Sequence, residues 1–250
     1  MRLTVLGSGA MMPTKGRYPS AYLIEKGGTK LLLDCGHLTL ARLVEHDVDL
    51  HSIRAVGITH FHTDHFSNLL PLIHARWVDD AVKKSQHRPL TVFGPTTLAE
   101  RFNKLREVMW PEPTESYPVT FVEGPGSHRV DTLSLHTFAV HHVPWFSSVG
   151  FKITDVDKSL AYTGDLSSEQ GSLFEEQIRG VDILIIEAGA VRPSKTHVTA
   201  DDAVQLAQRC AIKRVVLTHV REDYLSTTQT IVARYPDLLV IAEDGMTVTL

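Results

Sequence analysis

Six consecutive residues hold three imidazoles and one carboxylate, in the order His60-Phe61-His62-Thr63-Asp64-His65. Mixed imidazole and carboxylate ligands are typical of zinc or manganese sites, whereas calcium and magnesium prefer more oxygen ligands. A single pair of histidines would be a common surface feature, but four ligands at these spacings favour a metal site. The segment therefore predicts a metal-dependent hydrolase.

The residues before this segment predict how it is positioned. Residues 54–59 are small, apolar or β-branched and indicate a buried strand that ends at His60. While the chain stays extended, His60 and His62 point to the same side and can bind one ion together. We expect Asp64 and His65, at the turn into a predicted helix over 67–78, to reach a second ion beside the first.

Three further strands are predicted to end at residues that could bind a metal. The strand over 133–140 runs into His141 and His142, residues 159–164 run into Asp165, and residues 214–218 run into His219. Each has a structural alternative on its own: a turn histidine, a helix N-cap or a polar residue at a strand end. Because the ends of buried strands gather at one edge of a sheet, the recurrence favours a shared site.

Composition is that of a globular protein. The chain has 250 residues, 43% hydrophobic and 22% charged, and we expect a single domain over 1–250 because no low-complexity linker divides it. No apolar stretch of membrane-spanning length or signal-like start is evident, so a cytoplasmic protein is expected. Cys35 and Cys210 are too few for a disulfide framework and are expected to be buried thiols.

Apolar patterns predict two β-rich halves, each covered by helices, and hence an α/β (α+β) fold arranged as a four-layer αββα sandwich. The proline-bearing stretch 110–127 predicts a loop with a strand over 119–122. The remaining strands are expected at 2–6, 20–25, 29–34, 91–94, 182–186, 238–242 and 246–250, and the remaining helices at 38–45, 96–109, 169–179 and 200–210.

Several segments together resemble the metallo-β-lactamase-fold hydrolases, and among these the ribonuclease Z-like phosphodiesterases. The resemblance rests on Leu3-Thr4-Val5-Leu6-Gly7-Ser8-Gly9-Ala10, Leu31-Leu32-Leu33-Asp34-Cys35-Gly36, the histidine segment, Tyr162-Thr163-Gly164-Asp165, Ile183-Leu184-Ile185-Ile186-Glu187 and Val216-Leu217-Thr218-His219. The element most specific to this subgroup is His197-Val198-Thr199-Ala200, which opens a helix before the last histidine.

The resemblance implies two metal sites that share one ligand. His60, His62 and one histidine of the pair His141 and His142 would bind the first ion, and His142 is favoured. Asp64, His65 and His219 would bind the second ion, and Asp165 would bridge the two. His141 would then orient the ligands or face the substrate. The expected cofactors are two divalent metal ions, zinc before manganese.

Two metal ions about 3.5–4 Å apart would share a water and lower its pKa, so that hydroxide forms near neutrality. The expected catalytic residues are Asp64, His197 and Glu187, with His197 as the proton donor to the leaving oxygen and Glu187 assisting it. His197 has an alternative role as a residue at a helix N-terminus. Asp34 would either hold a ligand imidazole in place or start a turn.

Departures from ribonuclease Z limit the expected substrate. Ribonuclease Z has a long arm for tRNA, whereas only a short segment separates Val149 from Thr163 here, and the net charge of −4 offers no general attraction for phosphate. A small or cyclic phosphodiester or an RNA 3′ end is therefore expected, with Arg17, Lys195 and Trp145 as candidate substrate-binding residues. The alternatives are a lactone, thioester or carboxylic ester hydrolase and a non-catalytic accessory subunit, and a homodimer is expected from the resemblance alone.

Overall fold

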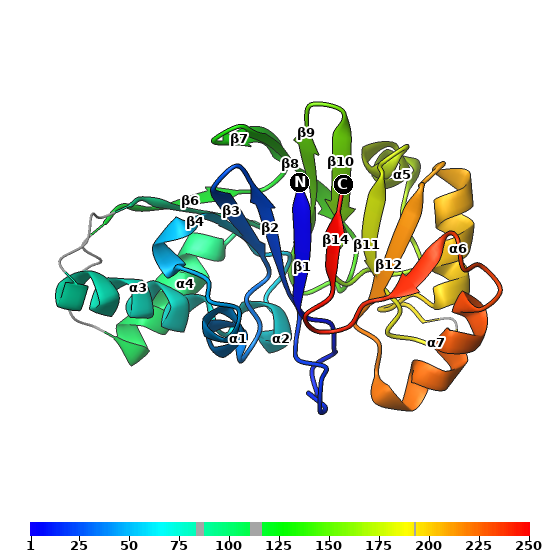
Figure 1. Ribbon diagram of the computed structural model, residues 1–250, viewed down its shortest axis with the longest axis horizontal. Helices are drawn as coiled ribbons and strands as arrows, with labels where there is room; N and C mark the ends of the chain where they lie inside the picture. Colours follow the sequence, from blue (N-terminus) through cyan, green and yellow to red (C-terminus); the bar gives the residue numbers. More distant parts are fainter. Residues whose placement is uncertain (84–87, 111–116, 193) are drawn as a thin grey trace.

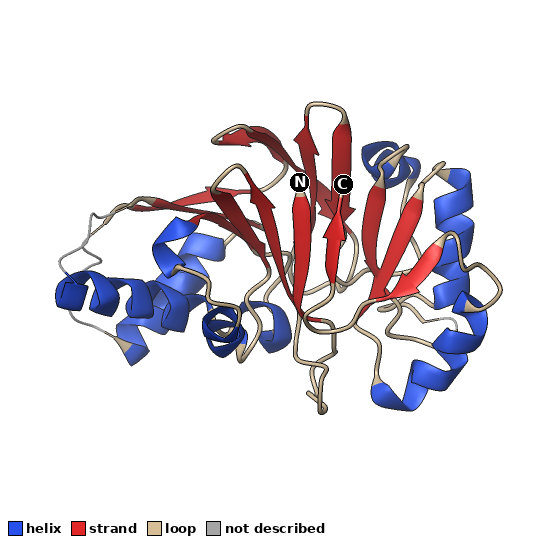
Figure 2. Cartoon of the chain, in the orientation of Figure 1, coloured by secondary structure: helices blue, strands red, loops and turns tan. Residues whose placement is uncertain are grey.

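The computed structural model describes residues 1–83, 88–110, 117–192 and 194–250. Two seven-stranded sheets lie face to face, and helices cover the outer face of each sheet (Figures 1 and 2). This arrangement confirms the predicted four-layer αββα sandwich. The part of the predicted loop at 111–116 lies outside the described residues.

The first sheet has the strand order β14-β1-β2-β3-β4-β5-β6. Its strands β1 to β3 pair antiparallel, and β3 to β6 pair parallel. The strands are β1 (Arg2–Gly7), β2 (Ala21–Lys26), β3 (Thr29–Leu33), β4 (Ile53–Gly57), β5 (Leu90–Gly94), β6 (Val119–Glu123) and β14 (Thr247–Thr249).

The second sheet has the order β13-β12-β11-β10-β9-β8-β7 and is built in the same way. Strands β7 to β10 pair antiparallel, and β10 to β13 pair parallel. The strands are β7 (Gly126–Val130), β8 (Leu133–Val140), β9 (Ser148–Asp155), β10 (Lys158–Tyr162), β11 (Ile183–Glu187), β12 (Arg214–Thr218) and β13 (Leu239–Ile241).

Helices α1 to α4 belong to the first half of the chain and α5 to α7 to the second, on opposite sides of the sandwich (Figure 1). In the described parts of the chain, no helix combines the length and the apolar character needed to cross a membrane. The helices are α1 (Thr39–Glu45), α2 (Thr63–Phe66), α3 (Leu69–Lys83), α4 (Leu98–Met109), α5 (Ser172–Ile178), α6 (Ala200–Arg209) and α7 (Leu225–Val232).

Apolar side chains fill the space between the two sheets and beneath each helical layer. Leu3 and Leu31 of the first sheet share the central cluster with Phe151, Ile185 and Val216 of the second. All five residues of β11 are buried, as expected for a parallel strand covered on both faces. The core thus fixes the two sheets against each other and places the ends of their strands along a common edge.

The predicted helix over 67–78 begins two residues later and ends five residues later in the structure, where it is α3, and a separate short helix precedes it. A short helix, α2, holds Asp64 and His65, and α3 continues beyond the predicted end to Lys83. Asn68 lies at the junction, where its N–H donates to the carbonyl of Cys35 and its Oδ1 accepts from Leu40 N–H. These hydrogen bonds to Cys35 and Leu40 fix the position of Asn68 between the two helices.

Three elements differ from the sequence-based expectation. Strand β7 lies within and beyond the stretch predicted as loop, because it is an edge strand with polar side chains on its exposed face. Helix α7 was not predicted. The closing strand β14 does not join the second sheet with the rest of the C-terminal half, because it pairs with β1 in the first.

Candidate metal centre

The side chains that follow β4, β8, β10 and β12 meet at one edge of the sandwich. Donor atoms of His60, His62, His142 and Asp165 lie within 4.8 Å of one another, as do those of Asp64, His65 and His219. We call these the first and second ligand groups. Asp165 also lies within the same limit of His197 and His219, so it adjoins both groups.

In the first group, hydrogen bonds fix which nitrogen faces the centre. The hydroxyl of Thr59 donates to Asp34 Oδ2 at 2.9 Å and therefore accepts from Nδ1–H of His60, also at 2.9 Å. Nδ1–H of His142 donates to the carbonyl of Thr196 at 2.8 Å. These bonds leave Nε2 of both His60 and His142 unprotonated and directed toward the centre.

The spacing of these nitrogens fits a cation. His62 Nδ1 lies 3.1 Å from His60 Nε2 and 3.3 Å from His142 Nε2. Three nitrogens bound tetrahedrally to zinc at about 2.0–2.1 Å would be about 3.3 Å apart. Because two of the three present lone pairs, a shared cation explains their close approach.

The second group is built around His65. Its Nδ1–H donates to Asp34 Oδ2 at 2.6 Å, which leaves Nε2 to face Asp64 Oδ2 at 3.6 Å and Asp165 Oδ1 at 3.4 Å. His219 Nε2 lies 3.1 Å from Asp64 Oδ2 and 3.4 Å from Asp165 Oδ2. Asp34 therefore orients an imidazole of the site, which is the first of its two predicted alternatives.

Asp165 lies between the groups because of the glycine before it. Gly164 has a positive φ of 62°, and a Cβ there would lie 2.6 Å from Cβ of Thr59. The buried Nε2 of His65 and Oδ1 of Asp165 have no hydrogen-bond partner among the described residues. Buried polar atoms without partners are unfavourable, and a metal ion would satisfy both.

The electrostatics of the first group also suit a cation. Burial lowers the pKa of His60 well below its usual value and that of His142 to about 4, so both imidazoles are neutral. Burial alone would raise the pKa of Asp165, but His219 and His65 outweigh it and hold that pKa well below the usual range. Neutral imidazoles and an ionised carboxylate are the states in which these groups bind metals.

In the second group, protons compete with a metal. Burial opposes protonation of His65, but the carboxylates of Asp165 and Asp64 outweigh it and raise its pKa well above the usual value. The pKa of His219 is raised for the same reason, against the effect of burial. Metal binding at this group would therefore release protons.

His197 and Glu187 form a pair next to both groups. Nδ1 of His197 lies 2.9 Å from Oε2 of the fully buried Glu187. The His197 ring is 5.4 Å from that of His142 and stacks at 5.5 Å on that of His219. Burial lowers the pKa of His197, but its hydrogen bond to the Glu187 carboxylate and the charge of that carboxylate outweigh burial and raise the pKa to about 9.

The structure separates the two adjacent histidines after β8. His142 is buried and belongs to the first group, whereas the side chain of His141 is exposed and belongs to neither group. The main chain of His141 is bound to Gln170, which accepts from its N–H and donates to its carbonyl. Of the two histidines, His142 is therefore the candidate ligand in this geometry.

The three candidate substrate-binding residues lie in different environments. Arg17 is only 7% exposed, and its Nη1 donates to the carbonyl of Ala242 at 2.8 Å and to Ser8 Oγ at 3.3 Å. These bonds occupy the guanidinium in holding the chain together, and we do not propose it as a phosphate ligand. Lys195 is exposed, and Trp145 is 67% exposed.

Sequence reasoning missed several residues that support the site. The carbonyl of Thr196 holds His142, and the hydroxyl of Tyr162 donates to Asp34 Oδ2 at 2.6 Å. Phe146 covers the first group, with its ring 5.9 Å from His60 and 5.1 Å from His62. Thr196 and Tyr162 each lie within three residues of a candidate site residue, and this closeness in the sequence could have suggested that they support the site.

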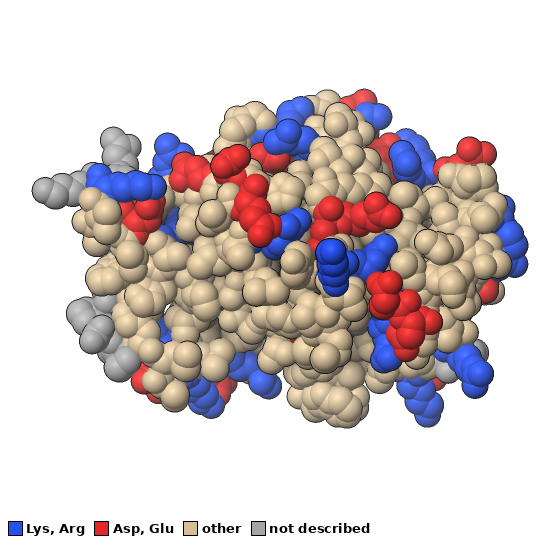
Figure 3. Space-filling view, turned by 60° about the horizontal axis from the view of Figure 1, so that its bottom comes forward, with Lys and Arg blue, Asp and Glu red and all other residues tan. Residues whose placement is uncertain are grey.

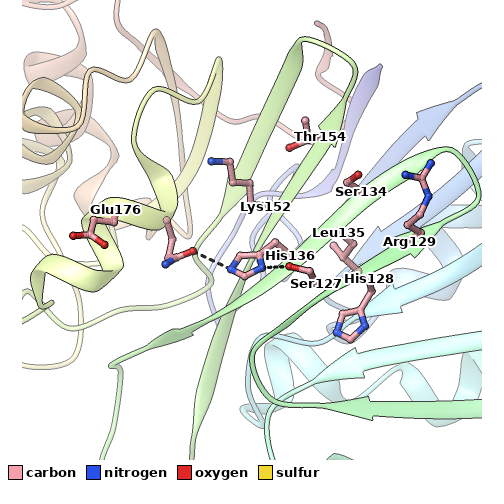
Figure 4. A pocket seen from close by; sticks show the side chains of 10 residues that line it. Ser127, His128, Arg129, Ser134, Leu135, His136, Lys152, Thr154 and Glu176 are labelled. Carbon is pink, nitrogen blue, oxygen red and sulfur yellow. Dashed lines mark hydrogen bonds between the residues drawn. The ribbon is translucent and has the colours of Figure 1, made fainter.

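A polar hollow of about 640 Å³ lies elsewhere, on the outer face of β7 to β9 (Figure 4). There His136 lies 2.9 Å from both Ser127 Oγ and Gln177 Oε1. None of the residues of either ligand group lines this hollow. We therefore treat it as separate from the metal centre.

Charged side chains on the face shown in Figure 3 are scattered, with acidic and basic groups interspersed around a broad area that carries neither. Among the residues that the structure describes, the Lys and Arg side chains on this face form no continuous stripe.

Comparisons with known proteins agree with this geometry. A family model described as Anti-Pycsar protein Apyc1 matches residues 1–234. A ribonuclease Z of Mycobacterium sp. (strain KMS) is 26% identical over 244 residues, covering 88% of this chain and 84% of the relative.

Two solved structures share the fold over nearly their whole length. The metallo-β-lactamase fold protein YhfI from Bacillus subtilis has a TM-score of 0.81 at 24% identity, covering 99% of this chain and 98% of that one. The short form of human tRNase Z also has a TM-score of 0.81 at 24% identity, covering 100% and 99%.

Proposed function

The chain belongs to the family described as Anti-Pycsar protein Apyc1 and is a metal-dependent hydrolase resembling ribonuclease Z, and from this premise we propose that it is a dinuclear phosphodiesterase. The observation that supports a pair of ions most directly is the position of Asp165 between two groups of ligands. The first ion would be held by His60, His62 and His142 and the second by Asp64, His65 and His219, with Asp165 shared.

When bound, the two ions would supply a water of lowered pKa and offset the negative charge of a phosphodiester. The first group offers three imidazole nitrogens at spacings that fit zinc, which we propose ahead of manganese. Thr59, Asp34 and Thr196 would hold the ligand imidazoles in the orientation that the ions require.

We propose His197 as the proton donor to the leaving oxygen. Glu187 accepts the hydrogen bond from Nδ1, which keeps the imidazole protonated at neutral pH and leaves Nε2–H available to the leaving group. Glu187 is itself buried and also accepts from the N–H groups of Leu166 and Gly189, so it is held in place. It thus acts as a positioning residue for His197.

We propose a small or cyclic phosphodiester, or the 3′ end of a short RNA, as the substrate. Ribonuclease Z among the relatives supports a phosphodiester, and the scattered charges in Figure 3 support a compact phosphodiester over a long nucleic acid bound along that face. Lys195 is exposed near His197 in sequence and is a candidate phosphate contact. The homodimer remains a prediction.

The test compares ester classes. Purified protein should hydrolyse bis-para-nitrophenyl phosphate but not simple lactones, lose this activity on chelation, and regain it with zinc or manganese. Elemental analysis should find two equivalents of metal. The reverse substrate preference would favour the carboxylic ester or thioester hydrolase, and metal binding without turnover of either class would favour the accessory subunit.

A further inference from the structure

The candidate ligand His219 has an uncommon main-chain conformation. Its φ is 56°, in the left-handed region that residues other than glycine adopt only at an energetic cost. Such a conformation persists where the surrounding structure holds it. The contacts that hold the main chain of His219 therefore help to decide where its imidazole lies.

The imidazole of His219 is not fixed through its second nitrogen. Its Nε2 lies 3.1 Å from Asp64 Oδ2, but its buried Nδ1 has no hydrogen-bond partner among the described residues. In His65, by contrast, Nδ1–H donates to Asp34, which orients the ring. The orientation of the His219 ring therefore depends on its main chain and on the groups packed around it.

The main chain of His219 is attached to Ser8, in the first loop of the chain. The N–H of His219 donates to the carbonyl of Ser8 at 2.9 Å, and the hydroxyl of Thr218 donates to the same carbonyl at 3.3 Å. Ser8 is completely buried. A displacement of Ser8 would therefore release the N–H of a candidate ligand.

Asp244, in the connection between β13 and β14, fixes Ser8. Its Oδ1 accepts from the N–H of Ser8 at 2.8 Å and from the Ser8 hydroxyl at 2.7 Å, and its Oδ2 accepts from the N–H of Tyr18 at 2.8 Å. Hydrogen bonds to an ionised carboxylate are stronger than those between neutral groups. Asp244 belongs to neither ligand group, but it holds both ends of the loop that bears Ser8.

Arg17 adds to this attachment. Its Nη1 donates to the Ser8 hydroxyl and to the carbonyl of Ala242, and the N–H of Ala242 donates to the carbonyl of Leu217 at 2.8 Å. Residues 242–244 therefore join the first loop to the end of β12, directly before His219.

We infer that Asp244 is a positioning residue of the second ligand group, which acts through Ser8 to hold the main chain of His219 and thereby its imidazole. This inference rests on the proposed dinuclear function, in which His219 binds the second ion. The imidazoles of the first group are held by other residues, Thr59 and Thr196. Loss of Asp244 should therefore affect the second ion and spare the first.

Amide hydrogen exchange of the metal-free protein, followed by NMR, tests the attachment itself. In Asp244→Ala the N–H of His219 should exchange at least about tenfold faster, because its acceptor is no longer held. The N–H of Ala188, which donates to the carbonyl of Thr218, should keep its rate. Glu243→Ala, which removes the neighbouring exposed carboxylate, is the matched control and should change neither rate.

A second variant guards against failure of Asp244→Ala to fold. Asp244→Asn keeps one side-chain oxygen that can accept from Ser8 but loses the charge, so its effect on the exchange of His219 should have the same direction and be smaller.

Competition with a chromogenic chelator tests the consequence for metal binding. The protein should bind two zinc ions, and His219→Ala should identify the one held by the second group. Asp244→Ala should weaken that ion by about 10- to 100-fold and leave the affinity for the other unchanged.

Three results would overturn the inference. They are unchanged exchange of His219 in both Asp244 variants, equal acceleration of His219 and Ala188, which would indicate general loosening, and equal weakening of the two ions. Binding of fewer than two ions by the unaltered protein would instead contradict the proposed dinuclear centre, while the exchange rates would still decide whether Asp244 holds His219.

Discussion

Nδ1–H of His65 donates to Oδ2 of Asp34 at 2.6 Å, and the same oxygen accepts from the hydroxyls of Tyr162 and Thr59. This buried carboxylate therefore links an imidazole of the second ligand group to a hydroxyl that orients His60 in the first. One residue orients ligands of both groups without being a ligand itself.

Asp34→Asn should weaken metal binding by about 10- to 100-fold, because it removes the negative charge that orients and polarises His65. Competition with a chromogenic chelator measures the affinity. Asp157→Asn, at an exposed turn between β9 and β10, is the matched control and should leave the affinity unchanged. Normal affinity in Asp34→Asn would show that the ligands hold their positions without this carboxylate.

His197→Ala should lower kcat by about 10²- to 10⁴-fold while the metal content stays the same, because the variant loses the proposed proton donor but none of the proposed ligands. Rates and elemental analysis on the same preparation test both parts. His136→Ala, in the separate hollow, is the control. If metal is lost together with activity, His197 is a ligand and its assignment as the acid is wrong.

The pH dependence of kcat follows from the pair of His197 and Glu187. Since the acid must be protonated to act and its pKa is raised to about 9, activity should persist through neutral pH and fall as the pH rises through about 9. Glu187→Gln removes the charge that raises this pKa, so the alkaline fall should move toward neutral pH. Identical alkaline limbs in the two proteins would contradict the proposed role of Glu187.

Gly189→Ala should disturb the site by steric overlap. A Cβ at this position would lie 2.7 Å from Oε2 of Glu187, 3.1 Å from Nδ1 of His219 and 3.2 Å from Nδ1 of His197. We expect a loss of about 1–3 kcal/mol in the free energy of unfolding and a lower kcat. Gly171→Ala should be nearly neutral in denaturant titrations, because a Cβ there meets nothing within 4 Å.

Removal of metal should destabilise the fold, because ions that bind the native state add to its stability. At a free metal concentration about 100 times Kd, the gain per site is about 2.7 kcal/mol. Thermal unfolding with and without a chelator measures it, and added zinc should restore the original Tm. An unchanged Tm despite full removal of metal would argue against ions held by both sheets.

Local patterns were enough to predict the two sheets and the strand ends at which the candidate ligands lie. Apolar runs that stop at His60, Asp165 and His219 mark the ends of β4, β10 and β12 in the structure. The order of the strands was harder to predict from the sequence. The strand β14 has only three residues, and its pairing with β1 joins the two ends of the chain.

The environments of single side chains also depend on distant residues. The sequence suggested Arg17 as a phosphate ligand, yet its guanidinium donates a hydrogen bond to the carbonyl of Ala242 in the structure. The choice between His141 and His142 depends on which side of the chain faces the centre after β8. The roles assigned to the ligands and to His197 remain predictions until the variants above are measured.

The candidate ligands follow strands of both sheets, and the chain that separates the first from the last runs from His60 to His219. When the first 65 residues have left the ribosome, four of the candidate donors are present, but the residues that would complete the two ligand groups are not. Capture of the second ion would have to wait until His219 emerges and docks, so metal loading would be a late event of biogenesis that reports completion of the fold.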